Sequence, residues 1–152
     1  MTSYCVFNVG DRRIGIPMTD VREVIEPRLI VPTPMPLMPA FVRGLFNHRG
    51  QIIPYLDLAP FLGAEATPAG PANQRAVIVE RGNFRFATVG GEFETIAADP
   101  ATFQAPADAA LYPALDQEAK TRRGTFTVLH LDRLEACLAQ TLKYTEPMAA
   151  TA

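Results

Sequence analysis

The side chains in this sequence that most often carry catalysis or bind metals are two histidines and two cysteines, His48, His130, Cys5 and Cys137. A cysteine and a histidine can act together as nucleophile and base when the fold brings them into contact. Their spacing does not match a metal site, and the sequence contains no HExxH, glycine-rich phosphate loop, GxSxG or CxxC motif. We therefore predict a binding protein without catalytic activity, cofactor or metal, in which both cysteines are reduced and partly buried.

Hydrogen bonding by an arginine is the interaction that the sequence favours in place of catalysis or metal binding. The arginine, Arg49, lies in the segment GLFNHRGQIIPYLDL, residues 44–58, where Arg49 and Gly50 separate two apolar runs. A guanidinium group has five N–H donors for nearby carbonyl or carboxylate groups. Asp57 and Glu23 are candidate acceptors. Gly50 is expected to need a positive φ in the turn. The alternative is that Arg49 only fixes its own loop, since buried polar groups must be paired in any protein.

The composition predicts a globular protein, because 48% of the 152 residues are hydrophobic and 20% are charged, and the length suits one domain or two very small ones in contact. A net charge of −2 argues against electrostatic binding of nucleic acid. The N-terminus lacks the basic and apolar regions of a secretory signal, and no apolar run approaches the roughly eighteen residues of a membrane-spanning helix. We expect a soluble, cytoplasmic protein that does not insert into a membrane.

The first half is predicted to contain a β-hairpin, a short helix, a proline-rich connector, a pair of strands and a helical turn. In chain order these elements occupy residues 4–17, 19–26, 27–39, 42–56 and 59–62. The hairpin turns at Gly10. The short helix is inferred from Thr19 and Asp20 as a cap, followed by apolar residues three and four positions apart. Gly63 would end the helical turn.

The second half follows residues 63–74, which are small, proline-rich and polar and are predicted to be a linker. It is predicted to contain a hairpin, a long loop, a strand and an amphipathic helix, followed by a frayed tail. These segments occupy residues 75–89, 98–124, 125–130 and 131–142, with the tail after Lys143. The Gly90–Gly91 pair has no following helix that could cradle phosphate, so a turn or bulge is expected there.

The second half repeats the pattern of the first half at a nearly constant shift along the sequence. The matched positions are Cys5 with Val77, Phe7 with Val79, Gly10 with Gly82, Ile14 with Phe86, Val21 with Phe93, Val24 with Ile96, Arg49 with Arg123, and Leu56–Asp57 with Leu131–Asp132. Chance explains any single apolar match, but the shared order of turn, glycine and Leu-Asp favours a duplicated unit. Units of about 70 residues are near the lower limit of independent stability, so we expect a shared interface with a groove for a partner.

Residues 42–58 resemble the signature of the CheW-like chemotaxis coupling proteins: a glycine, two apolar residues, Asn-Leu-Arg-Gly, and an apolar strand with a proline that ends in Asp-Leu. The opening strand, the turn at Gly10 and the segment 20–24 resemble the same family, and the resemblance covers roughly residues 4–140. It implies an all-β fold with a few short helices: one domain, 1–152, of two five-stranded β-barrels packed side by side. The barrels would lie at about 15–62 and 75–130, with terminal segments crossing between them.

The resemblance implies a non-catalytic scaffold that couples chemoreceptors to a CheA-type histidine kinase in bacterial chemotaxis, a two-component signal transduction pathway. Its partners would be the regulatory domain of the kinase and the cytoplasmic tip of methyl-accepting chemoreceptors, in arrays at the inner membrane. The chain is too short to carry the phosphotransfer and ATP-binding domains of the kinase. His48 stands where the family usually has leucine, and the second half departs further from the family pattern. The alternatives are an adaptor of a type IV pilus or other non-flagellar pathway, and a capping inhibitor of kinase regulatory domains.

The resemblance also implies contact sites for both partners. The candidate kinase-binding residues lie on the predicted first helix and are Met18, Val21, Glu23 and Val24. The candidate receptor-binding residues are Arg49, Phe93 and Ile96, with Phe93 and Ile96 as an apolar floor and Glu92 and Glu94 at the rim. The residues expected to shape the turn and its strand are Asn47, Gly50 and Asp57. For each apolar residue the alternative is a place in the core, because apolar residues at regular spacing usually pack inside.

Overall fold

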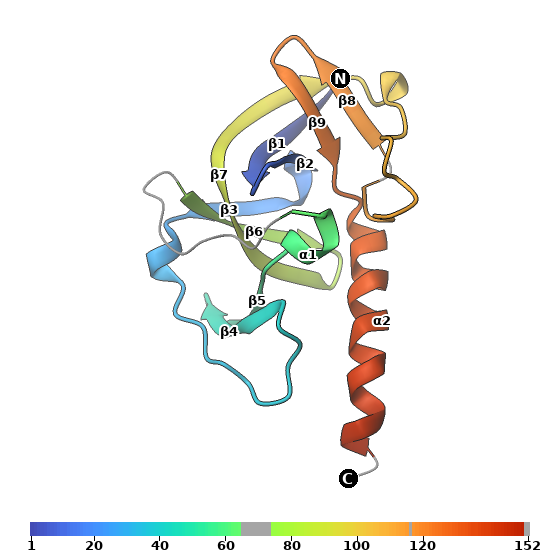
Figure 1. The fold of residues 1–152 in the computed structure, drawn as a ribbon. Coiled ribbons are helices and arrows are strands. Elements are labelled where there is room, and N and C mark those ends of the chain that lie inside the picture. The colour runs from blue at the N-terminus through green and yellow to red at the C-terminus, as the bar shows by residue number, and fades with distance from the viewer. Residues whose placement is uncertain (65–73, 116, 151–152) are drawn as a thin grey trace.

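The computed structural model describes residues 1–64, 74–115 and 117–150, which fold as nine β-strands, two α-helices and three 3₁₀ turns (Figure 1). The strands and helices are β1 (Thr2–Val9), β2 (Arg12–Pro17), β3 (Val21–Ile25), β4 (Val42–His48), β5 (Gln51–Leu56), α1 (Ala59–Leu62), β6 (Gln74–Arg81), β7 (Phe84–Ala98), β8 (Gln117–Thr121), β9 (Gly124–Val128) and α2 (Leu131–Ala150). The 3₁₀ turns are Met18–Asp20, Pro27–Leu29 and Pro100–Thr102. The expected all-β class is confirmed. Within the described ranges, no helix combines the length and hydrophobicity that crossing a membrane requires.

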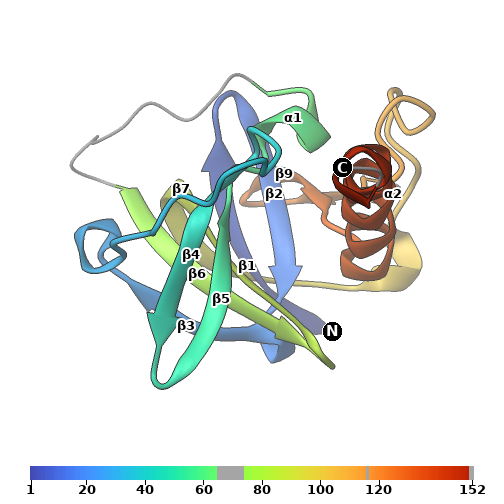
Figure 2. The same cartoon turned by 90° about the horizontal axis from the view of Figure 1, so that it is seen from below.

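The strands form one sheet that runs β3–β6–β7–β1–β2–β9–β8, with β4 paired to β5 and β5 to β7. The first part of the long strand β7 pairs with β6 and its last part pairs with β1. The strands therefore lie in two groups side by side: β3, β4, β5 and β6 around the first part of β7, and β1, β2, β8 and β9 beside its last part (Figures 1 and 2). The pairing of the described residues closes neither group. The expected pair of five-stranded barrels is thus corrected to one continuous sheet, because β7 belongs to both groups.

The hairpins that begin the two halves agree with the first step of the predicted repeat. Val9 pairs with Arg12 around Gly10, and Arg81 pairs with Phe84 around Gly82. Each glycine has a φ of 59° and is the first residue of a two-residue turn, as in the type II′ turns that glycine favours. The same local chemistry therefore builds the same hairpin at the matched positions of both halves.

The strand after each hairpin pairs with the hairpin of the other half. β3 pairs with β6, with Val24 opposite Val77, and the last part of β7 pairs with β1, with Ile96 opposite Tyr4. The two pairings match each other in the repeat, except that the register of the second is shifted by a single position. Each strand group therefore contains strands from both halves of the sequence. The predicted linker 63–74 lies mainly outside the described residues.

The short helix predicted from Thr19 onward is wrong. Met18–Asp20 forms only a 3₁₀ turn, and Val21–Ile25 is strand β3. Three of its five residues are β-branched, a composition that favours strands, and β6 offers a pairing partner from the other half of the sequence. Tertiary pairing overrides a helical pattern that covers barely two turns.

The second half contains one strand that the sequence did not predict. Gln117–Thr121, inside the expected loop 98–124, forms β8 and pairs with β9. Only Ala119 of β8 is buried, so the strand has almost no hydrophobic alternation to reveal it. The closing helix is confirmed as α2, which continues through the predicted frayed tail to Ala150.

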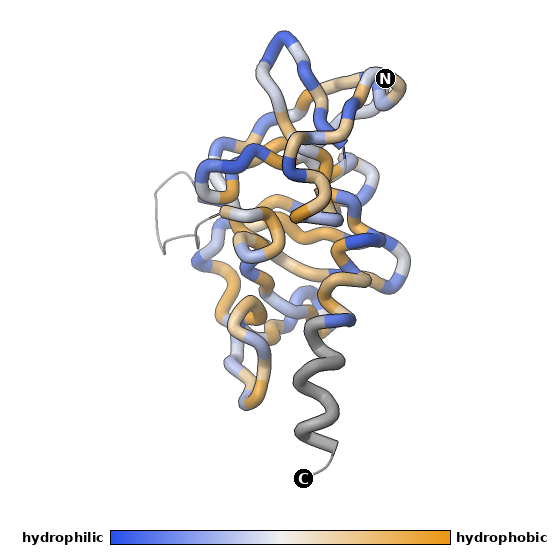
Figure 3. The backbone as a smooth tube through the Cα atoms, turned by 45° about the vertical axis from the view of Figure 1, so that its right-hand side comes forward, coloured by the Kyte–Doolittle hydropathy of each residue, from blue (hydrophilic) through white to orange (hydrophobic). Residues whose placement is uncertain are grey.

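Among the described residues, the core consists of three clusters that follow the repeat. Tyr4 and Val6 of β1 lie in the cluster inside the second strand group, and Ala76 and Ile78 of β6 lie in the cluster inside the first group. The intervening residues of both strands lie in a central cluster that also contains α1 and α2 residues. Hydrophobic segments accordingly run through the middle of the molecule, whereas the tip of the β8–β9 hairpin is hydrophilic (Figure 3).

A turn or bulge was expected at Gly90–Gly91, and a bulge lies directly after this pair, where Glu92 and Phe93 are opposite the single residue Phe7. The register between β1 and β7 shifts between Val6 and Asn8, opposite Gly91. A Cβ atom on Gly90 would lie 2.3 Å from the Phe7 ring, so this position excludes any side chain. The bulge lies where β7 passes from one strand group to the other.

Candidate functional site

The Arg49–Gly50 turn joins β4 to β5 through two residues with positive φ. His48 pairs with Gln51, and the φ angles of Arg49 and Gly50 are 52° and 85°, which corresponds to a type I′ turn. The Asn47 side-chain oxygen accepts a hydrogen bond of 2.8 Å from the Gly50 N–H. The expected positive φ of Gly50 is confirmed. Arg49 is unusual, because a non-glycine residue in this region costs about 1–2 kcal/mol.

The Arg49 side chain reaches across to β3. Its guanidinium donates to Glu23 Oε1 at 3.0 Å, while His48 Nε2 lies 2.9 Å from Glu23 Oε2. The hydrogen bond to His48 and the charge and hydrogen bond of Arg49 lower the pKa of Glu23. Of the two candidate acceptors, Glu23 is therefore the partner. Asp57 instead pairs with Arg43 at 3.4 Å and accepts from the Ala59 N–H at 3.1 Å, where α1 begins.

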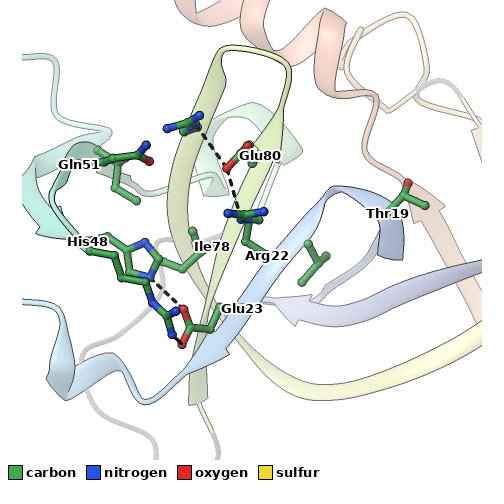
Figure 4. Close-up of a pocket in the computed structure, with 11 residues that line it drawn as sticks. Thr19, Arg22, Glu23, His48, Gln51, Ile78 and Glu80 are labelled. Carbon is green, nitrogen blue, oxygen red and sulfur yellow. Dashed lines mark hydrogen bonds and ion pairs between the residues drawn. The ribbon is translucent and has the colours of Figure 1, made fainter.

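A hollow of about 590 Å³ lies beside this ion-paired group, and we call it the β3 slot (Figure 4). Its lining residues come from β3 and the turn before it, from the β4–β5 hairpin, and from the β6–β7 hairpin. They are Thr19, Val21, Arg22, Glu23, His48, Arg49, Gln51, Ile53, Ile78, Glu80 and Arg85. The volume falls in the range of about 300–1,000 Å³ that is usual for ligand sites.

A second ion-paired group lies on the other side of the slot. Glu80 of β6 is 3.4 Å from Arg22 of β3 and 3.3 Å from Arg85 of β7. The Arg85 Nε atom is buried, and its contact with Glu80 does not have the geometry of a hydrogen bond. Figure 4 shows the Glu80 carboxylate between two guanidinium groups and the Glu23 carboxylate against the His48 ring. Each carboxylate of the slot is thus shared by two basic side chains.

The candidate kinase-binding residues lie on one strand and its preceding turn, not on a helix. Met18 and Val24 are exposed, and Glu23 is half-buried. Val21 is half-buried and packs against the central core cluster. Because side chains three apart on a strand point to opposite faces, Val21 and Val24 do not form the continuous apolar stripe that the helical interpretation required.

The candidate receptor-binding residues are separated by the fold. Arg49 is exposed at the β4–β5 turn, whereas Phe93 stacks on Phe7 with ring centroids 4.7 Å apart. Ile96 is 2% exposed and belongs to the cluster inside the second strand group. Ile96 is therefore a core residue, which was the alternative expectation, because β7 turns this side chain inward against β1.

The two acidic residues expected at the rim of that receptor site have local partners. Glu92 accepts a hydrogen bond from Asn8 at 3.1 Å and has a φ of 51°, next to the bulge. Glu94 forms an ion pair with Arg13 of β2. Both side chains therefore join β7 to the first hairpin, and we do not place them in a docking groove.

Sequence reasoning missed four residues of this region: Arg22, Ile52, Glu80 and Arg85. Ile52 is 64% exposed on β5. Its exposure has a sequence signal, since Ile52 and Ile53 are adjacent in a strand and only one of them can face the core. The charged three have no such signal, because they come from β3, β6 and β7 and meet only when those strands pair.

The cysteines and histidines that opened the sequence analysis have other surroundings. Cys5 is buried in the central cluster, and burial raises the pKa of its thiol to about 11, opposite to what a thiolate nucleophile requires. His48 pairs with Glu23, and His130 accepts a hydrogen bond from the Arg133 N–H. In the described part of the chain, no three His, Cys, Asp or Glu side chains are grouped to hold a metal ion.

The fold and the turn match one protein family. A model described as the CheW-like domain matches residues 3–135, so this chain belongs to the CheW-like family. In structure it resembles the scaffolding protein TtCheW from Thermoanaerobacter tengcongensis, with a TM-score of 0.72 and 25% identity over 84% of this chain and 88% of that one. The resemblance on which the sequence analysis relied is confirmed.

Three curated relatives match about half of this chain. Protein FrzA of Myxococcus xanthus is 43% identical over 65 residues, which are 43% of this chain and 39% of FrzA. Protein PilI of Pseudomonas aeruginosa is 40% identical over 74 residues, 48% of this chain and 39% of PilI. The probable chemotaxis protein CheW of Rhizobium etli is 38% identical over 74 residues, 48% of this chain and 44% of that protein. The matches thus span less than half the length of these relatives.

Proposed function

We propose that this protein is a non-catalytic scaffold that couples chemoreceptors to the regulatory domain of a CheA-type histidine kinase, in cytoplasmic arrays at the membrane. The observation that carries the proposal is the CheW-like match across residues 3–135, supported by the likeness to a scaffolding protein of the same family. FrzA and PilI are at least as similar to this chain as the protein named CheW. A role in a chemosensory pathway other than chemotaxis is therefore the second candidate function.

The proposed kinase surface consists of the exposed residues around β3. The candidates from the family resemblance that reach the surface are Met18 and Val24, which are exposed, and Glu23, which is half-buried; Val24 is 44% exposed. An apolar side chain in the centre of an interface, with a charged neighbour at its rim, is the usual arrangement of a protein contact.

The substitution Val24→Lys tests this surface. We expect at least a tenfold loss of affinity for the kinase regulatory domain from the same organism, measured by isothermal titration calorimetry, with an unchanged melting temperature. Val31→Lys is the matched control, because Val31 is 78% exposed on the loop after the second 3₁₀ turn. Equal affinity of the Val24 variant and the wild type would contradict the assignment.

The proposed receptor surface is centred on the Arg49 turn and the exposed Ile52. Co-sedimentation with receptor-containing membranes separates an adaptor from a capping inhibitor. An adaptor raises the amount of kinase that sediments with the membranes, whereas a capping inhibitor lowers it. The Arg49→Ala variant is expected to reduce kinase recruitment while it still binds the isolated regulatory domain.

A further inference from the structure

A second hollow, of about 380 Å³, lies between helix α2, the strands β4 and β5, and the loop that leads into β4. We call it the α2 groove. Glu135, Leu138 and Ala139 of α2 line one side of it, and Met38 and Phe41 of the loop line the other. The volume falls in the range of about 300–1,000 Å³ that is usual for ligand sites.

The floor of the α2 groove is the outer face of the β4–β5 hairpin. Two cross-strand pairs, Val42 with Leu56 and Leu45 with Pro54, line it. The residue after Leu45 and the residue before Pro54 face the other way, into the cluster inside the first strand group. An antiparallel pair of strands with one solvated face alternates apolar and polar residues. Apolar residues on both faces therefore indicate an outer face that a further element covers.

The backbone around this floor is already paired. The Thr33 N–H donates to the Leu45 carbonyl at 2.7 Å, and the Leu45 N–H donates to the Thr33 carbonyl at 3.0 Å. The Val42 N–H donates to the Pro39 carbonyl at 2.9 Å, and β5 lies between β4 and β7. An occupant therefore cannot add as a strand beside the groove. It must satisfy its own backbone hydrogen bonds, as a helix does.

Helix α2 offers the groove a face that suits a second helix. Glu135, Leu138 and Ala139 have the spacing of one helical face, and Leu138 is buried while the other two are exposed. The distance between two packed helices depends on the side chains at their contact, so the small Ala139 allows a close approach. A helix on the β4–β5 floor would pack against α2 on one side and against Met38 and Phe41 on the other.

The charge at the rim of the groove favours a basic side chain on the occupant. Among the described residues, Arg85 and Glu135 are the charged side chains that line the groove. Arg85 is paired with Glu80, whereas Glu135 makes no ion pair with the described part of the chain. A lysine or arginine beside the apolar face of a docked helix would complement Glu135, and such a rim pair fixes orientation more than it adds affinity.

The loop on the other side of the groove presents further apolar surface. Met35 is 45% exposed, Leu37 86% and Met38 38%. Leu37 has a φ of 65°, which is a strained conformation for a residue with a bulky side chain. Strain of this kind is found at sites that clamp a ligand, and flexible methionine side chains adapt to the shape of a partner. The loop is thus suited to contact an occupant on the side opposite α2.

We propose that the α2 groove binds an amphipathic helix of a partner protein, which lays its apolar face on the β4–β5 floor beside α2 and places a lysine or arginine against Glu135. Docking of an amphipathic helix in an apolar groove is a common mode of recognition. The groove shares Arg85 alone with the β3 slot and includes none of the residues assigned above to kinase or receptor contact. The inference therefore goes beyond the proposed function and describes a separate surface of the protein.

The test uses the full chain labelled with ¹⁵N and a peptide of two repeats of Leu-Gln-Lys-Leu-Leu-Gln-Lys, acetylated and amidated, followed by NMR. The leucines of this peptide share one helical face. We expect saturable shifts of the backbone amides of residues 42–45 and 135–139. The Ala139→Arg variant, which fills the groove and adds a positive charge, should bind at least tenfold more weakly. Ala136→Arg is the matched control and should bind as the wild type does, because Ala136 is also exposed on α2 but does not line the groove.

Two further peptides test the helix and its charge. A peptide of the same composition, with its leucines spread around the helix, should not bind, and equal binding of both arrangements would overturn the amphipathic helix. A peptide with glutamate in place of each lysine should bind the wild type at least fivefold more weakly, and the Glu135→Lys variant should reverse this preference. An unchanged preference in that variant would overturn the contact with Glu135.

Sedimentation velocity of the free chain separates a partner helix from a second copy of this protein. We expect the wild type and the Ala139→Arg variant to sediment alike. A wild-type dimer that Ala139→Arg dissociates would show that a second copy fills the groove, and would overturn the proposal. Peptide-induced shifts that avoid residues 42–45 and 135–139 would overturn it as well.

Discussion

The two halves of the molecule each carry an Arg-Gly turn that faces a neighbouring strand, and the contacts of the two arginines differ. We call the boundary between β3 and the β4–β5 turn the first seam, and the boundary between the last part of β7 and the β8–β9 turn the second seam. At the first seam Arg49 binds the Glu23 side chain, and at the second Arg123 donates to the Thr95 backbone carbonyl at 3.3 Å. Glu23 and Thr95 occupy matched positions of the repeat. Both seams therefore have the arginine contact, but the acceptor is a carboxylate at the first seam and a backbone carbonyl at the second.

The two turns also differ in backbone. Arg49 is the first residue of its two-residue turn and has a φ of 52°. In the second hairpin Thr121 pairs with Gly124, so Arg123 is the second turn residue, and the positive φ of 111° falls on Gly124. The same dipeptide is therefore placed one position apart in the two hairpins. Only the first turn places its arginine in the left-handed region.

A second pair of matched arginines also has different partners in the two halves. Arg13 and Arg85 occupy matched positions in the two opening hairpins. Arg85 pairs with Glu80 within its own hairpin, whereas Arg13 pairs with Glu94 on β7 and donates to the Arg123 carbonyl at 3.4 Å. Arg13 thus ties the second seam together. A separate hollow of about 330 Å³ beside Arg13 is lined by residues of β2, β9 and the turn at Asp11, together with Gly63.

The largest expected difference between the halves concerns Val24 and Ile96, which are matched in the repeat. Ile96→Ala should lower the free energy of unfolding by about 2–5 kcal/mol, because it empties a buried position. Val24→Ala should change it by about 0.5 kcal/mol or less, as exposed substitutions do. Urea denaturation of both variants checks the comparison. Equal losses would show that β3 and the last part of β7 are not distinguished by burial.

A smaller effect on stability is expected at the two turns, and its sign should differ between them. Arg49→Gly should be more stable than Arg49→Ala by about 0.5–1 kcal/mol, because glycine adopts the left-handed region without steric cost. Arg123→Gly should be less stable than Arg123→Ala, because φ is not positive there and glycine adds entropy to the unfolded chain. Thermal melts of the four variants provide the measurement. The same sign at both turns would contradict the difference in backbone.

The smallest expected effect is the pH dependence of the first seam. The pKa of Glu23 is lowered from its ordinary 4.5, first by the hydrogen bond to His48 and then by Arg49. Its contribution to stability is therefore present above pH 4.5 and is lost as the pH falls below that value. An exposed pair contributes about 1 kcal/mol or less. The wild type should lose this increment on acidification through that range, and the Glu23→Gln variant should not. If the stability of the two proteins changed with pH in the same way, Glu23 would not be the source of the pH dependence.

The turn chemistry of the sequence was sufficient to predict the elements that are bounded by glycine turns. Glycine positions located the β1–β2 and β6–β7 hairpins, the Arg49–Gly50 turn and the end of α1 at Gly63, and apolar spacing located α2. These predictions hold because a turn with positive φ, or one apolar face of a helix, is determined by residues close together in the chain.

The sequence by itself also determined the family, through the turn signature, and the duplicated order of the hairpins. Only the tertiary structure decided that residues 21–25 form a strand, that β3 and the last part of β7 exchange partners between the halves, and that Ile96 is buried. Strand pairing depends on hydrogen bonds and contacts with residues far away in sequence, so short polar or β-branched segments such as β8 and β3 take their structure from their partners. The β3 slot exists for the same reason: Arg22, Glu80 and Arg85 meet only because three strands from both halves lie side by side.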